Sequence, residues 1–266
     1  MKKYLIALIA MLLLIIPIAS CGSVSDLVPK VLAANTQDTV QEVKQDSSSV
    51  FDEIQHNIDL VTNLKTKVEQ AKINGKATSI DDVIKDIQTV SDSYNKLSGQ
   101  HDAIRKDLLR KIQAVEDMQK QVNDQIAVLK QRRLGYVQQL QAVKDPNPDI
   151  VRTRQEALTQ AIKYVDAQVQ LWTDFNNVEA NIVSQMADIQ KTIDSFLSVI
   201  DSSAILFKEG LNLLKLQKNI NDALSLFTQD IPKMQQLTTD MEKSWANLDY
   251  LINTLITLST EGLPIK

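Results

Sequence analysis

The chain has 266 residues, a formal net charge of −4 and only 5% aromatic residues. This acidic balance argues against a general nucleic-acid-binding protein, which would be basic. The low aromatic content favours helices packed through aliphatic seams over a large globular core rich in aromatic bulk.

The first twenty residues have the layout of an export signal. Lys2 and Lys3 precede an apolar run over residues 4–18, and small residues follow that run. A membrane-spanning helix needs about 20 apolar residues, whereas this run is shorter and is interrupted by Pro17. We therefore predict that residues 1–20 are a cleaved signal peptide.

The four residues from Ile18 to Cys21, Ile-Ala-Ser-Cys, resemble the lipobox of bacterial lipoproteins, although that family most often has Leu in place of Ile18. The resemblance covers residues 1–21. It implies cleavage before Cys21, a diacylglyceryl thioether on the sulfur, and often a third acyl chain on the new amino terminus. Two or three acyl chains would hold the protein stably on a membrane. Because Cys21 is the only cysteine, we expect neither a disulfide framework nor a thiolate metal cluster.

The residue after the lipidated position bears on the destination of the chain. In the sorting rules that the lipoprotein resemblance implies, Asp at this place favours retention in the inner membrane, and the chain has Gly22. We therefore expect the outer membrane, facing the periplasm, in a two-membrane organism. In a one-membrane organism the same signal implies the outer face of the cytoplasmic membrane.

Residues 21–37 are predicted to be a lipidated tether. Five apolar residues in it are spaced like one helical face, which leaves open that this segment rests on the membrane or starts the fold: Val24, Leu27, Val28, Val31 and Leu32. Apolar residues then recur at intervals of three and four over residues 37–73, which predicts a first long helix that ends at Asn74 and Gly75.

A second helix is predicted from about Ser79, where a capping signal stands, to about Lys144. Its apolar stripe alternates by three and four and shows a stutter between Leu108 and Ile112. The run Asp-Pro-Asn-Pro-Asp over residues 145–149 then predicts a sharp turn, because the residue before each proline is steered away from helix.

The return helix is predicted from Ile150 to about Lys208, and breaks at Gly210 and Pro232 separate shorter flanking helices. The two arms, each of about 60 residues, would lie antiparallel. We therefore predict an all-α fold, in which a long antiparallel helical hairpin (a coiled coil) merges into a three- to four-helix bundle over residues 38–260. Residues 261–266 are predicted to be a tail.

The two histidines are the candidate metal or haem ligands. Glu53 and His56 have the Glu-x-x-His spacing of di-iron bundles, but a second such pair is needed and His101 has Ser98 three residues earlier. His101 lies on the predicted seam, where an axial haem ligand is conceivable and a polar residue that fixes helix register is the stronger interpretation. Phosphate-loop, serine-nucleophile and zinc motifs are absent from the sequence. We expect no metal, no cofactor besides the lipid on Cys21 and no enzymatic activity.

A basic cluster stands out around the predicted hairpin turn. Residues 130–154 hold six basic residues against two acidic ones, Asp145 and Asp149. An anionic partner or a head-group surface could bind there, and a solvated end of a coiled coil is the plainer alternative. The candidate contact residues are Lys130, Arg132, Arg133, Lys144, Arg152 and Arg154.

These features predict a membrane-anchored envelope lipoprotein with a non-enzymatic role as spacer or adaptor, whose hairpin reaches an envelope protein that the sequence does not identify. A pore-forming or membrane-remodelling helical protein is the first alternative, although the mature chain offers no ready inserting segment. A cofactor-carrying bundle is the second alternative. Homo-oligomerisation stays open, because exposed seams could close between chains.

Overall fold

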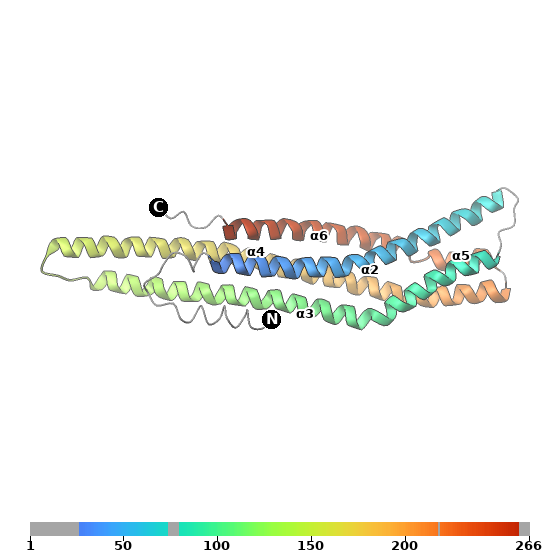
Figure 1. The fold of residues 1–266 in the computed structure, drawn as a ribbon, viewed down its shortest axis with the longest axis horizontal. Coiled ribbons are helices and arrows are strands. Elements are labelled where there is room, and N and C mark those ends of the chain that lie inside the picture. The colour runs from blue at the N-terminus through green and yellow to red at the C-terminus, as the bar shows by residue number, and fades with distance from the viewer. Residues whose placement is uncertain (1–26, 74–79, 218, 261–266) are drawn as a thin grey trace. The chain divides into compact units, whose positions relative to one another are not determined.

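The computed structural model describes residues 27–73, 80–217 and 219–260 (Figure 1). Within these ranges every regular element is an α-helix, so the all-α prediction is confirmed. The helices are α2 (Leu27–Ile73), α3 (Ile80–Ala142), α4 (Pro148–Gln217), α5 (Ile220–Thr228) and α6 (Ile231–Thr260). None of them combines the length and the apolar character that crossing a bilayer requires.

The helices are shared between two compact units, which we call the hairpin unit and the aromatic unit. Of the described residues, the hairpin unit comprises 27–39, Gln113–Ser184 and 249–260. The aromatic unit comprises Val40–Ile112 and Gln185–Leu248. Each unit thus contains segments of α2, α3, α4 and α6, and α5 belongs to the aromatic unit.

The hairpin unit contains the predicted antiparallel arms. The C-terminal part of α3 and the N-terminal part of α4 lie side by side and are joined by the turn that follows Ala142 (Figure 1). The first turns of α2 and the last turns of α6 supply further buried apolar residues, such as Leu32 and Leu255. The prediction of a helical hairpin that merges into a bundle is therefore confirmed.

The aromatic unit gathers much of the chain's small aromatic complement. Phe51 and Phe196 meet edge to face with ring centroids 4.7 Å apart, and Tyr94 meets Phe207 in the same way at 5.1 Å. Phe227 lies 4.9 Å from Phe207. Such pairs stabilise a core beyond the area that they bury. Burial raises the pKa of Tyr94, and the nearby carboxylate of Asp230 raises it further.

The structure contradicts the tether prediction for residues 27–37. α2 begins at Leu27, ten residues earlier than expected, and Leu32, Ala33 and Thr36 are buried in the hairpin unit. The apolar face noted in this segment therefore starts the fold, because its side chains pack against other helices. The signal peptide, Cys21, the rest of the tether and the C-terminal tail lie outside the described residues.

The predicted helix break at Gly210 is also wrong, because α4 continues to Gln217. A Cβ atom at Gly210 would stand 2.3 Å from Cε1 of Phe227. Glycine is therefore needed here for close packing of α5 on α4 rather than for a change of direction. Pro232 stands in the first turn of α6, where its missing N–H is tolerated.

Candidate functional site

The hairpin turn is held by its own polar groups. The N–H of Asn147 donates to Oδ1 of Asp145 at 2.9 Å, and the N–H of Asp149 donates to Oδ1 of Asn147 at 2.9 Å. Pro148 begins α4, a position that suits proline. The N–H of Val151 donates to the carbonyl of Asn147 at 3.2 Å. Asn147 thus caps α4, and the predicted turn is confirmed.

The six predicted contact residues lie on the two arms and in the turn. Arg133 forms an ion pair with Asp166 of the opposite arm. Arg152 pairs with Asp149, one turn earlier on α4, with 3.3 Å between the guanidinium nitrogen and the carboxylate oxygen. The other four side chains are exposed, and no ion pair is found for them among the described residues: Lys130, Arg132, Lys144 and Arg154.

The apolar seam between the arms loses its cover near the turn. Leu129, 7% exposed, and Val165, 2% exposed, are the last buried residues of the two arms. No side chain from residue 130 to residue 164 is buried, and Leu134 and Ile150 are 48% and 40% exposed. Two helices alone cannot enclose a seam that further helices cover elsewhere in the unit. We call residues 130–164 the tip.

The first turns of α2 point toward the tip. The Thr36 hydroxyl donates to Oε1 of Glu179 on α4 at 2.8 Å and lies 3.5 Å from the sulfur of Met118 on α3. Within the hairpin unit α2 runs antiparallel to α3 (Figure 1). The start of α2, from Thr36 back to Leu27, therefore lies along the part of α3 that leads from Met118 toward the tip.

Glu179 is a fully buried carboxyl in the same region. Burial raises its pKa to about 7, and the hydrogen bond from Thr36 acts in the opposite direction. The second carboxyl oxygen has no hydrogen-bond partner among the described residues. This arrangement joins α2 to α4 through one hydroxyl, and the carboxyl changes its charge near neutral pH. Glu179 stands at helical spacing between Phe175 and Ile182, but its charge hides it in a pattern of apolar residues, so it is not among the predicted site residues.

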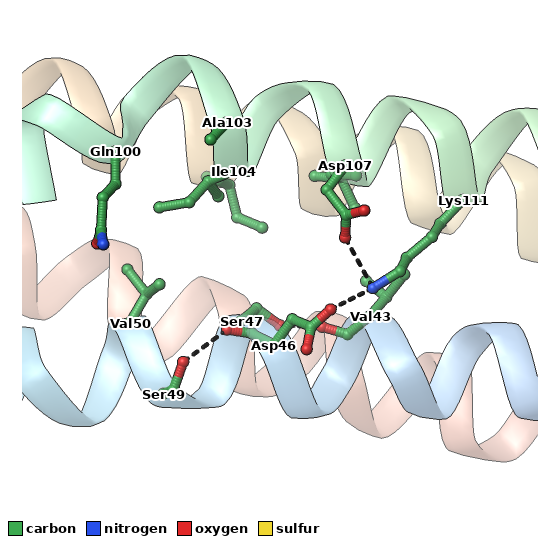
Figure 2. Close-up of a pocket in the computed structure, with 12 residues that line it drawn as sticks. Val43, Asp46, Ser47, Ser49, Val50, Gln100, Ala103, Ile104, Asp107 and Lys111 are labelled. Atoms are coloured by element: carbon green, nitrogen blue, oxygen red, sulfur yellow. Dashed lines mark hydrogen bonds and ion pairs between the residues drawn. The ribbon is translucent and has the colours of Figure 1, made fainter.

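A groove of about 370 Å³ lies in the aromatic unit between α2 and α3 (Figure 2), and Ile193 of α4 also lines it. Its apolar wall includes Val43, Val50 and Ile104. Its polar residues are Asp46, Ser47, Ser49, Gln100, Asp107 and Lys111. None of these residues is among the predicted site residues, because the groove forms only when segments of two helices that are distant in the sequence pack together.

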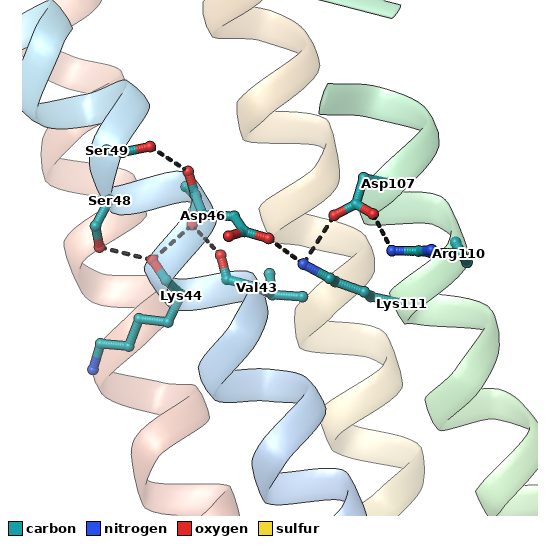
Figure 3. A network of polar contacts seen from close by, with 9 residues as sticks. Val43, Lys44, Asp46, Ser48, Ser49, Asp107, Arg110 and Lys111 are labelled. Atoms are coloured by element: carbon teal, nitrogen blue, oxygen red, sulfur yellow. Dashed lines mark hydrogen bonds and ion pairs between the residues drawn. The ribbon is translucent and has the colours of Figure 1, made fainter. Parts of the chain in front are cut away.

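The charged groups of the groove are partnered with one another (Figure 3). The ammonium of Lys111, a residue only 7% exposed, contacts Asp46 on α2 and lies 2.8 Å from Asp107 on its own helix. Burial lowers the pKa of Lys111, but the hydrogen bonds to Asp107 and Asp46 outweigh burial and raise it overall. The hydrogen bond from Lys111, aided by Arg110, lowers the pKa of Asp107. The network therefore ties α3 to α2.

The two histidines occupy different settings. His56 is exposed, and Glu53 accepts a hydrogen bond from Ser93 at 2.7 Å and pairs with a lysine of α3. His101 lies at the edge of the seam with Nδ1 3.2 Å from a carboxylate oxygen of Asp201, so it joins α3 to α4. Within the ranges that the structure covers, no three His, Cys, Asp or Glu side chains are grouped to hold a metal ion.

Of the tip, the groove and the Glu179 region, the tip presents cationic groups to solvent without an ion-pair partner in the described part of the chain. The groove and Glu179 connect helices to one another. Functional assignment therefore rests on the chemistry of these residues. Comparison with protein-family models, with curated proteins and with solved structures gives no match to this chain.

Proposed function

We propose that this chain is a bacterial envelope lipoprotein that is cleaved before Cys21, acylated there and held on a membrane surface. Its mature helices act as a non-enzymatic spacer or adaptor. The lipobox-like residues 18–21, the charged and apolar segment before them, and the single cysteine support the anchor. The expected place is the outer membrane facing the periplasm, or the outer face of the membrane in a one-membrane organism.

The tip is the observation that carries the interaction role. Side chains that stay exposed contribute little hydrophobic free energy to folding, and none of residues 130–164 is buried. A projection of this kind, with six basic residues around its turn, is therefore explained by contact with something outside the chain. The tip is thus the segment through which the chain would contact a partner or a surface outside itself.

The anchor is tested by mass spectrometry and fatty-acid labelling of the protein from its native membrane. We expect a mature chain that starts at Cys21 and carries acyl groups, and a C21S variant without fatty acid. A G22D variant is the matched control, because it changes the neighbouring residue and should keep the fatty acid. If native protein retains residues 1–20 and carries no fatty acid, the proposal is wrong.

A pore-forming or remodelling protein is the second candidate function, and the partly exposed Leu134 and Ile150 of the tip favour it. Such a protein should release a trapped dye from liposomes to which it binds. Binding without release would remove this candidate and leave the adaptor role.

A further inference from the structure

The tip is positively charged on a chain that is acidic overall. Residues 130–164 contain seven basic and three acidic residues, whereas the whole chain has a formal net charge of −4. Four of the basic residues, Lys130, Arg132, Lys144 and Arg154, are exposed and have no ion pair in the described part of the chain. The local charge is therefore available to an anionic partner.

The same segment exposes apolar groups between its charges. Leu134 on α3 and Ile150 on α4 are both more than one-third exposed and lie on opposite arms. Basic residues with interleaved apolar side chains suit the boundary between lipid head groups and acyl chains. The charges are spread over both arms and the turn instead of converging on one pocket, which fits a broad anionic surface better than a shaped protein ligand.

Chain length limits where an anchored membrane can be. Leu27 is nine residues before Thr36, while the arm of α3 runs on from Met118 to Ala142. Since α2 and α3 are antiparallel here, the tip extends roughly 20 Å beyond the start of α2. The six residue steps from Cys21 to Leu27 span at most about 20 Å. A bilayer that holds an acylated Cys21 is therefore within reach of the tip.

We propose that the tip docks on the anionic head-group surface of the same bilayer that holds the Cys21 lipid. Only the identity of the bilayer rests on the proposed anchor; the affinity of the tip for anionic lipid rests on its own charge and apolar residues. The acyl chains and the basic tip then both bind one membrane surface. The two contacts together hold the protein more firmly than either contact alone. The two contacts also restrict how the hairpin unit can rotate on the membrane.

The first test uses the unlipidated mature chain, residues 21–266 with C21S, and vesicles sedimented after incubation. We expect binding to vesicles rich in phosphatidylglycerol and little binding to phosphatidylcholine alone, with affinity falling as salt rises. Each basic residue near an anionic surface strengthens binding about fivefold. If all four unpaired ones contact the surface, neutralising them by K130Q, R132Q, K144Q and R154Q should therefore weaken binding by about 600-fold.

A matched variant removes four exposed lysines from the aromatic unit, K67Q, K85Q, K208Q and K233Q. It changes the net charge by the same amount and should keep most of the binding. Equal loss in both variants, or equal binding to both kinds of vesicle, would overturn the proposal. Failure to bind vesicles together with cross-linking of an acidic protein from the tip in cells would replace the bilayer by a protein partner.

These experiments test the proposed anchor and the proposed docking of the tip independently. If native protein lacks fatty acid and the vesicle assay is positive, the tip still binds anionic lipid and the proposed lipoprotein is wrong. If native protein is acylated and the vesicle assay is negative, the lipoprotein stands and the docking of the tip is wrong. Circular dichroism of each glutamine variant shows whether the helices are retained, so that a loss of binding is not a loss of folding.

Discussion

Two charged residues, Lys111 and Glu179, occupy positions that helical spacing assigns to the core. Lys111 stands between Leu108 and Val115 on α3, and Glu179 stands after Phe175 on α4. A pattern made from apolar residues alone passes over both positions, and at Lys111 it was interpreted as a stutter. The structure shows that the spacing continues through them. Whether a charge is tolerated there depends on partners from other helices, which the local sequence does not specify.

The buried carboxyl of Glu179 makes the hairpin unit less stable at alkaline pH. Its folded pKa, about 7, lies above the ordinary value of 4.5, so the folded state binds more protons than the unfolded state between these values. The contribution of Glu179 to stability is therefore fully present below about pH 4.5 and is lost as pH rises through 7, by about 3 kcal/mol in total. Urea unfolding at pH 5 and pH 8 measures this difference for the unit.

An E179Q variant removes the titration and keeps an oxygen that accepts the hydrogen bond from Thr36. We expect it to unfold at higher urea than the native chain at pH 8 and to differ little at pH 5. Fluorescence of Trp172, which belongs to the hairpin unit, follows this transition when Trp245 is replaced by W245F. Equal pH dependence in the native chain and in E179Q would contradict the assignment.

At the scale of helices, boundaries set by local chemistry were predictable and boundaries set by packing were not. The ends of α2 and α3 near Ile73 and Ala142 follow from turn residues next to them, and the structure agrees within about two residues. The start of α2 at Leu27 depends on burial of Leu32 against distant helices. A glycine such as Gly210 locally predicts a helix break, yet the helix continues through it. The glycine is needed because the ring of Phe227 from α5 packs against this position.

The contact between Gly210 and Phe227 predicts an unusual response to alanine. Alanine ordinarily stabilises a helix by up to about 1 kcal/mol relative to glycine. G210A instead places a methyl group against the ring of Phe227, which is 2% exposed and packed on Phe207, so it has little room to move. We expect a net loss of about 1–3 kcal/mol from overpacking, measured by urea unfolding.

Two other helical glycines provide the control. In the part of the chain that the structure describes, a Cβ at Gly99 or Gly135 would meet no atom within 4 Å, so G99A and G135A should each stabilise the protein by up to about 1 kcal/mol. The smaller side chain in F227L should reduce the cost of G210A. A G210A protein as stable as G99A would show that the helices α4 and α5 do not approach as closely as described.

At the scale of the whole molecule, the sequence contains the basic cluster and the lipobox-like residues 18–21, but it does not show how the two are related in space. The charges around the turn are local, and they can be counted in the sequence. The direction of α2 relative to the tip depends on Thr36 meeting Met118 and Glu179, residues 82 and 143 positions away. That packing turns the start of α2 toward the tip, so the proposed anchor and the basic cluster would face one membrane surface rather than opposite ends.

Two contacts with one bilayer predict that salt exposes the tip without releasing the protein. In the lipidated chain the sulfur of Cys21 is blocked, so a Q141C variant carries one reactive thiol at the tip, and N177C carries one on α4 outside it; both native residues are exposed. A membrane-impermeant maleimide should label Q141C several-fold more slowly than N177C at low salt.

Raising salt screens the charges and should equalise the two labelling rates, while the acyl chains keep the protein sedimenting with the membrane. Equal rates at low salt would mean that the tip stands free of the bilayer, because a thiol in contact with head groups is shielded and a solvated one is not.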